Sequence, residues 1–383
     1  MLSTSTSHRM LSRELVRAFG GVLRVGSRLR LESATGAPMT LIGRMIDRIL
    51  PLTLLLVTAI DLPAYAANGD TLTQARTRGV LRCGVSQGVT GLSAKDAAGR
   101  WMGIDIDFCR AVAAVALGNA DRVTFIPLKA SARFPALCTG MVDLLSRNTT
   151  WTLVRESTLG VQFASVLFYD VQAFMVPAKS GVRRVADLGG AAACVEKGTS
   201  SEVHLVDYFA ERNLSVTPLV VDSASETADV YFQGRCRAYP ADAAHLSAVR
   251  LHAPGGAGEY VILPEQIAKE PRGPVVRAGV GAWLTLVRWM LFSLTAAGGY
   301  GVTQSNARVR LRDPLVARAL DPGTDVDTAN GVERGWVART VQVVGNYGEM
   351  FDRNLGARSP LNLERGLNRL WTEGGLIYAP PMR

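Results

Sequence analysis

Short apolar runs alternate with longer apolar and polar stretches along the chain. Residues 79–85, 123–126 and 142–145 are short and mostly apolar, which predicts buried strands. Residues 104–117 are rich in Ala and Val and long enough for a helix. This alternation predicts an α/β fold with a mostly parallel sheet, in which ligands bind at the carboxyl ends of the strands. The same rhythm predicts helices at 131–139, from 185–188 and at 203–212, and strands at 173–176, 192–195 and 237–242.

A polar segment, residues 146–155, follows the predicted strand at 142–145. Arg155 supplies a planar guanidinium group, which can bind a carboxylate through two parallel hydrogen bonds. Ser and Thr hydroxyls can form hydrogen bonds with the other polar atoms of a ligand. This combination suits a small zwitterion such as a free amino acid. The alternative for Arg155 is an ordinary loop arginine on a solvated face.

Two more polar turns end predicted strands. Residues 198–202 place Thr199 and Ser200 at the start of a predicted helix, where unpaired N–H groups and hydroxyls form an anion site. The alternative is a plain capping box that ends at Glu202. Asp242 offers a carboxylate for an ammonium group, although an Asp before Ala243 is equally typical of a helix N-cap.

The amino-terminal residues have the pattern of an export signal. Within 39–66, Arg44 and Arg48 precede an apolar run at 49–60, and a small-x-small cleavage site ends at Ala66. The run is shorter than the roughly twenty residues of a membrane-spanning helix. Cleavage after Ala66 is therefore predicted, with the mature chain in the periplasm. Residues 1–38 are interpreted as a non-native or disordered extension.

The positive charge comes partly from this leader. Residues 1–66 carry eight arginines and four acidic residues, so their removal lowers the formal net charge from +9 to +5. The remaining basic residues are scattered, without the clustered stripe that nucleic-acid binding requires. Nucleic acid is therefore not an expected partner.

All five cysteines lie in the mature part of the chain, which an oxidising compartment would allow to form disulfides. We expect Cys83 to pair with Cys109 and Cys194 with Cys236, each pair joining a strand to a nearby element, and we expect Cys138 to stay free. The alternative is free buried cysteines. The sequence has no C-x-x-C pair and no paired-histidine motif, so neither a metal nor another cofactor is expected.

Several motifs together carry a resemblance to a known family. The chain resembles the periplasmic solute-binding proteins of ABC importers for amino acids (bacterial solute-binding protein family 3), and in particular the branch for general, polar L-amino acids. The resemblance covers nearly all of residues 70–383, and its motifs are 103–111 (GIDIDFCRA), 145–152 (LSRNTTWT), 269–271 (KEP), 345–349 (GNYGE) and 374–381 (GGLIYAPP).

The resemblance implies a two-lobed, type II periplasmic-binding-protein fold whose two crossover strands form a hinge. Lobe 1 would comprise 67–170 and 273–383, and lobe 2 would comprise 171–272. The protein would be a monomer without enzymatic activity that captures an L-amino acid (glutamate, glutamine, aspartate, asparagine or a broad range) for an ABC permease in the inner membrane. Carried over by position, the ligand would contact Asn148, Thr150, Arg155, Thr199, Ser200 and Asp242, with Arg133 and Leu92 as further contacts.

Three positions depart from the family pattern. Leu92 stands where relatives carry an aromatic residue, Arg237 where they carry an acid, and the pair Pro240-Ala241 replaces a hydroxyl pair just before Asp242. These departures bear on which ligand is preferred. Two alternative functions use the same scaffold: an amino-acid-sensing co-receptor, and an enzyme like the periplasmic cyclohexadienyl dehydratases.

Overall fold

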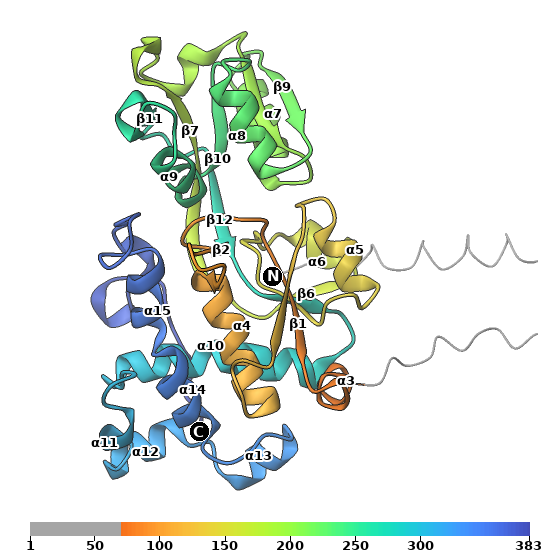
Figure 1. The fold of residues 1–383 in the computed structure, drawn as a ribbon, viewed down its shortest axis with the longest axis vertical. Helices are drawn as coiled ribbons and strands as arrows, with labels where there is room; N and C mark the ends of the chain where they lie inside the picture. Colours follow the sequence, from red (N-terminus) through yellow and green to blue (C-terminus); the bar gives the residue numbers. More distant parts are fainter. Residues whose placement is uncertain (1–69) are drawn as a thin grey trace, which may run out of the picture. The chain divides into compact units, whose positions relative to one another are not determined.

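The structure, a computed structural model, describes residues 70–383 (Figure 1). The predictions for the extension at 1–38 and the signal peptide at 39–66 lie outside these residues. The predicted lobe boundaries remain a prediction, but the described residues do form two groups of elements, each built around its own sheets.

The first group contains a five-stranded sheet with the order β4-β1-β5-β13-β6. The strand β1 (Leu81–Val85) runs parallel to its two neighbours, β4 (Val123–Pro127) and β5 (Leu144–Leu145). The strand β13 (Val275–Arg277) returns from far along the chain and pairs antiparallel with β5 and β6 (Val161–Phe163). Around this sheet lie α3 (Thr71–Arg78), α4 (Ile104–Leu117), α5 (Arg133–Cys138), α6 (Leu153–Thr158) and the small hairpin of β2 (Ala94–Lys95) and β3 (Trp101–Met102).

The helix α4 has the bounds that its sequence predicts. Gly103 precedes it, and its carboxyl end is closed by Gly118, whose φ of 70° is the left-handed conformation that glycine adopts without strain. Ile106, Phe108 and Val112 are fully buried, so this helix is covered on most of its surface. Its neighbours include α14 and α10 from the carboxyl-terminal part of the chain.

The carboxyl-terminal helices complete the core of the first group. The longest is α10 (Gly281–Gly299), in which Trp283, Val287 and Met290 are fully buried. No helix within 70–383 combines the length and apolar character that crossing a membrane requires. The others are α11 (Ala307–Arg310), α12 (Pro314–Leu320), α13 (Thr324–Ala329), α14 (Trp336–Val344) and α15 (Tyr347–Asn354).

The second group is built on the long strand β7 (Phe168–Pro177). Its later residues pair antiparallel with β10 (Tyr239–Asp242) and β11 (Tyr260–Ile262). A parallel pair, β8 (Ala192–Glu196) and β9 (Thr217–Val221), lies beside it, and the helices are α7 (Ser200–Ala210), α8 (Ala224–Phe232) and α9 (Ala243–Leu251).

Two strands carry the chain between the groups. It leaves the first sheet through β7 and returns through β12 (Ala268–Arg272), and the two pair antiparallel from Ala268 opposite Gln172 to Arg272 opposite Phe168 (Figure 1). This arrangement confirms the predicted α/β fold with two crossover strands. Two charged residues of β12, Glu270 and Arg272, are buried, which matters for the site described below.

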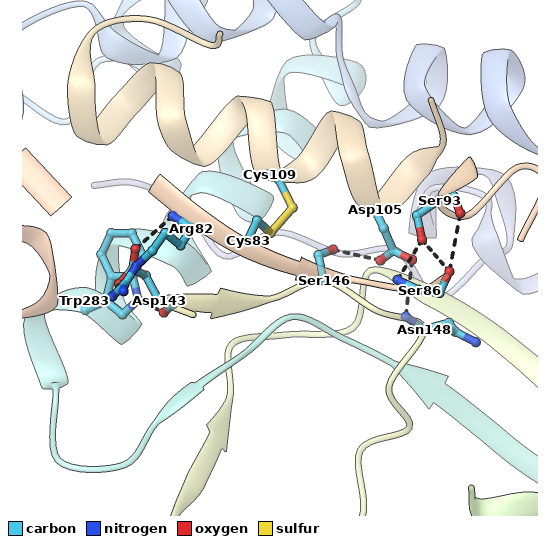
Figure 2. Close-up of a disulfide and its surroundings, with 10 residues drawn as sticks. All are labelled: Arg82, Cys83, Ser86, Ser93, Asp105, Cys109, Asp143, Ser146, Asn148 and Trp283. Carbon is cyan, nitrogen blue, oxygen red and sulfur yellow. Dashed lines mark hydrogen bonds and ion pairs between the residues drawn. A yellow bond between two sulfur atoms is a disulfide. The ribbon is translucent and has the colours of Figure 1, made fainter. Parts of the chain in front are cut away.

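The structure contains two disulfides, Cys83–Cys109 and Cys194–Cys236, and leaves Cys138 free and exposed. These are the two pairs expected from the sequence. The first ties the middle of β1 to α4 (Figure 2).

Removing the Cys83–Cys109 bridge is expected to destabilise the protein without unfolding it. The bridge closes a loop with a sequence separation of 26, and the chain-entropy model assigns about 3.5 kcal/mol to such a constraint. For a chain of this size that loss corresponds to a melting temperature about 5 °C lower in the Cys83→Ala, Cys109→Ala double variant. Calorimetry checks this, with Cys138→Ser as the control; equal melting temperatures for all three proteins would contradict it.

Candidate functional site

The loop after β5 is held in place by a buried acid at the start of α4. Asp105 is 4% exposed and accepts hydrogen bonds from the Ser146 hydroxyl (2.7 Å) and the Asn148 backbone N–H (3.2 Å) (Figure 2). Asn148 adopts a φ of 34°, a left-handed conformation that Asn tolerates better than most residues. The loop therefore has one fixed shape at the carboxyl end of the first sheet, where ligands of such sheets bind.

Two arginines of the first group lie buried next to this loop. Arg147 donates through Nε to the Leu128 carbonyl (2.9 Å), and its nearest carboxylate is Glu196, 3.4 Å away on β8. Arg133 is 2% exposed and donates to the Gly198 carbonyl (3.2 Å), with no carboxylate partner. Burial lowers the pKa of both guanidinium groups, because the charged form loses water.

The second group contributes an acid on the opposite side. Asp242 ends β10 and stands at the N-cap of α9, but its side chain makes no capping bond. Its Oδ2 lies 2.7 Å from Nη2 of Arg272, and its Oδ1 is buried without a partner. Burial raises the pKa of Asp242 to about 8, although the charge of Arg272 acts in the opposite direction. An unpaired carboxyl oxygen aimed at a pocket is suited to an ammonium group.

The turn at 198–202 stands at the amino terminus of a helix, as the sequence predicts, but it does not form the capping box that was the alternative. The helix α7 begins at Ser200, earlier than predicted, with Thr199 at the N-cap. Thr199 donates its hydroxyl to the Glu196 carbonyl (2.7 Å), so it does not cap the helix. The Glu202 carboxylate accepts from the Gly198 N–H (2.8 Å), one residue before the N-cap, so the turn forms no capping box.

These residues surround one pocket between the two groups. Arg133 and Arg147 face it from the first group, and Glu196 and Asp242 face it from the second. Four of the predicted ligand residues, apart from Arg133 and Asp242, also line it: Asn148, Thr150, Thr199 and Ser200. The remaining lining residues are Ser201, Tyr239, Pro240, Ala241 and His245.

Two predicted ligand residues do not line this pocket. Arg155 is half-buried, donates through Nη1 to the Thr150 carbonyl (2.7 Å), and lies over the Phe134 ring. Leu92 is 2% exposed and packs in the core of the first group. The sequence predicts no role for Arg147, which stands in the same polar segment as Arg155; its place two residues after the strand β5 is the signal that points to the pocket.

A buried charge cluster lies beneath the pocket. Arg272 on β12 is 2% exposed and contacts the carboxylates of Asp170 and Asp242 through Nη2. Glu270, two residues earlier on the same strand, is fully buried and accepts hydrogen bonds from Thr150 and Ser200. Among residues 70–383 no group of acidic, His or Cys side chains is arranged to hold a metal ion.

Comparison with known proteins gives consistent matches. Residues 81–310 match the family described as bacterial extracellular solute-binding proteins, family 3. The general L-amino acid-binding periplasmic protein AapJ of Rhizobium johnstonii is 43% identical over 84% of this chain and 95% of its own length. The glutamate/glutamine/aspartate/asparagine-binding protein BztA of Rhodobacter capsulatus is 42% identical over 85% of this chain and 97% of its own.

A solved structure agrees over a similar length. It is an ABC transporter/periplasmic binding protein from Brucella ovis with glutathione bound, 41% identical, with a TM-score of 0.78. The match covers 82% of this chain and 99% of that chain. A solute receptor for L-cysteine from Neisseria gonorrhoeae, 24% identical with a TM-score of 0.54, shares the fold.

Proposed function

Because the chain belongs to family 3 of the bacterial extracellular solute-binding proteins, we propose that it captures a free L-amino acid between its lobes and delivers it to an ABC permease. One observation carries this proposal: the pocket has buried guanidinium groups on one side, from Arg133 and Arg147, and a buried carboxyl group on the other, from Asp242. A zwitterion has the complementary pair of charges. The names of the relatives AapJ and BztA support the same ligand class.

The balance of charge favours an acidic amino acid. Arg133 has no carboxylate partner, and Arg147 has only Glu196 at 3.4 Å. A ligand with two carboxylates would give each guanidinium group a partner and so recover the cost of burying it. We therefore propose glutamate or aspartate as preferred ligands, with the α-ammonium group at Asp242.

Micromolar affinity for a free amino acid requires that the lobes close around the ligand. A micromolar dissociation constant corresponds to about −8 kcal/mol, which a ligand of about ten heavy atoms reaches only when it is nearly enclosed. The contacts Arg147–Glu196 and Arg133–Gly198 join the two groups beside the pocket, as a closed state requires. A ligand that touches both lobes stabilises that state. The protein would act as a monomeric binding protein in the periplasm, without catalysis.

A second candidate ligand is a short peptide with a free amino-acid end. The Brucella ovis protein, which is 41% identical to this chain, holds glutathione. The same charged pocket would bind the amino-acid end of such a molecule.

A ligand screen tests the proposal. The purified protein is unfolded to remove any bound ligand, refolded, and its melting temperature is measured with each of the twenty amino acids and with glutathione. A ligand at a hundred times its dissociation constant stabilises the folded state by about 2.7 kcal/mol, which for this chain is a rise of about 4 °C. We expect such a rise with glutamate or aspartate. If no amino acid raises the melting temperature, the proposed function is wrong.

A further inference from the structure

Glu196 brings a carboxylate to the part of the pocket where the two buried arginines lie. It ends the strand β8, and its side chain is largely buried. Its Oε1 atom lies 3.4 Å from Nη2 of Arg147 and accepts a hydrogen bond from the Ala130 N–H (3.4 Å). Within residues 70–383 no group donates a hydrogen bond to its Oε2 atom. One carboxylate oxygen is therefore held by the first group, and the other remains able to accept.

Arg133 keeps a donor unused beside this carboxylate. Its Nη2 atom donates to the Gly198 carbonyl (3.2 Å), whereas its Nε atom is buried without a partner in the described part of the chain. Arg133 and Glu196 both line the pocket. The pocket therefore offers a ligand one guanidinium donor and one carboxylate acceptor from these two residues.

Glu196 and Arg155 lie toward different ends of the site. Burial lowers the pKa of Arg147, and the charge of Glu196 is the largest cause that opposes this shift. Burial also lowers the pKa of Arg155, but there the opposing charges are those of Glu270 and Asp242. Because such effects weaken with distance, Asp242 lies nearer to Arg155 than Glu196 does. An amino acid whose α-ammonium group lies at Asp242 therefore extends its side chain toward Glu196.

The donor and the acceptor at this end together match a carboxamide. A carboxamide has a carbonyl oxygen that accepts and an NH2 group that donates, whereas an ionised carboxylate only accepts. A ligand carboxylate gains from the charge of the arginines but leaves the Glu196 Oε2 atom without a donor. A ligand carboxamide gives up that charge interaction and gains a hydrogen bond to an ionised acceptor, which is stronger than a bond between neutral groups. The pocket therefore suits both side-chain types.

We propose that Glu196 is a specificity-determining residue, whose Oε2 atom accepts a hydrogen bond from a side-chain carboxamide while Arg133 donates to the carbonyl oxygen of that group. L-glutamine and L-asparagine then bind beside the acidic amino acids, and loss of the Glu196 carboxylate restricts the pocket to acids. Glu196 and Asp242 are the two acids among the lining residues, and Asp242 is assigned to the α-ammonium group. The inference rests on the proposed function, because it requires the amino-acid end of the ligand at Asp242.

The test measures the selectivity between L-glutamine and L-glutamate. In Glu196→Gln the amide oxygen can take the contacts with Arg147 and Ala130, which places an NH2 donor where Oε2 was. We expect calorimetry to show that L-glutamine binds this variant about tenfold or more weakly than the wild type, since two donors then face each other. L-glutamate should weaken by less than about twofold, because its carboxylate gains a donor and loses a like charge.

A merely structural role gives a different result. Glu196 also joins the two groups of elements, so a residue that only helps the lobes to close would weaken both ligands by the same factor. The decisive quantity is the ratio of the two dissociation constants. A ratio within about threefold of the wild-type ratio, whether both ligands weaken or neither does, would overturn the inference.

The Asp222→Asn variant is the matched control. Asp222 is an exposed acid of the second group that lies 3.6 Å from Lys129 of the first group and does not line the pocket. Its loss should leave the ratio of the two dissociation constants within about twofold of the wild type. If Glu196→Gln does not fold, Glu196→Ala removes the same acceptor and should shift the ratio in the same direction by about three- to tenfold.

The wild-type protein separates this inference from the proposed function. If it binds L-glutamate but binds L-glutamine more than about a hundredfold more weakly, the role of Glu196 is wrong and the proposed function stands. If it binds no amino acid, the proposed function is wrong and the role of Glu196 falls with it.

Discussion

The Asp242→Asn variant is expected to lose amino-acid binding while it stays folded. The amide has nearly the same shape as the carboxyl group but leaves a buried ligand ammonium without a charged partner. Truncating one partner of a buried charge pair costs about 2 to 5 kcal/mol, which is a loss of about 30- to 5,000-fold in affinity. Calorimetric titration with L-glutamate measures the change. An affinity within threefold of the wild type would remove Asp242 from the site.

The pH dependence of ligand affinity distinguishes the charge of the Asp242 carboxyl group from its shape. Burial raises the pKa of Asp242 to about 8, so the free protein holds a proton there at neutral pH that binding of an ammonium group would release. Wild-type affinity should therefore rise between pH 6 and 8, and that rise should be absent in Asp242→Asn.

Stability should respond to pH in the opposite direction to affinity. A folded-state pKa above the unfolded value of 3.8 means that the folded protein keeps a proton that the unfolded chain releases, so stability falls as pH rises toward 8. The Asn variant should show less of this fall. Asp121→Asn, at an exposed acid outside the pocket, is the matched control and should keep both wild-type profiles.

Replacing Arg272 with Met is expected to cause the largest loss of folding stability. Asp170 and Asp242 would keep their buried positions but lose the guanidinium group that contacts both of them. Breaking a buried pair by removing one partner costs about 3 to 5 kcal/mol, because the remaining charge is uncompensated. The free energy of unfolding from urea denaturation measures the loss.

The loss of unfolding free energy in Arg272→Met should grow with pH. At pH 5 the two carboxyl groups left without a partner can take up protons, whereas at pH 8 they ionise at a cost in free energy. The matched control is Arg100→Met, which removes a surface ion pair with Asp96 at an arginine that is 78% exposed. Exposed pairs contribute about 0 to 1 kcal/mol, so the control should unfold almost like the wild type. A similar small effect at Arg272 would show that the buried cluster does not stabilise the fold.

Local pattern predicted several elements correctly and others only in part. The helix α4 begins and ends at the predicted residues, because its apolar run is continuous and Gly118 closes its end. The start of α7 was predicted three residues late, since a Gly-Thr-Ser-Ser turn reads as a loop whereas Ser200 and Ser201 already belong to the first turn of the helix. Residues 185–188 form only a short 3₁₀ turn, and the chain then enters β8.

The polar segment at 146–155 illustrates what local pattern leaves open. It contains two arginines. The sequence predicts that Arg155 binds the ligand carboxylate, whereas in the structure Arg147 and the more distant Arg133 line the pocket. The two arginines bond different partners: Arg147 donates to the Leu128 carbonyl, 19 residues away, whereas Arg155 donates to the Thr150 carbonyl within the same segment.

The sequence by itself determined the fold class, the crossover strands, the cysteine pairs and six of the thirteen residues that line the pocket. These follow from periodicity, turn residues and family motifs, all of which are read within short stretches of chain. Only the tertiary structure decided which charges meet. Glu270 reaches Thr150 across 120 residues, and Arg272 joins Asp170 and Asp242 from two other strands. Such contacts depend on strand register and closure of the lobes, which no local pattern specifies.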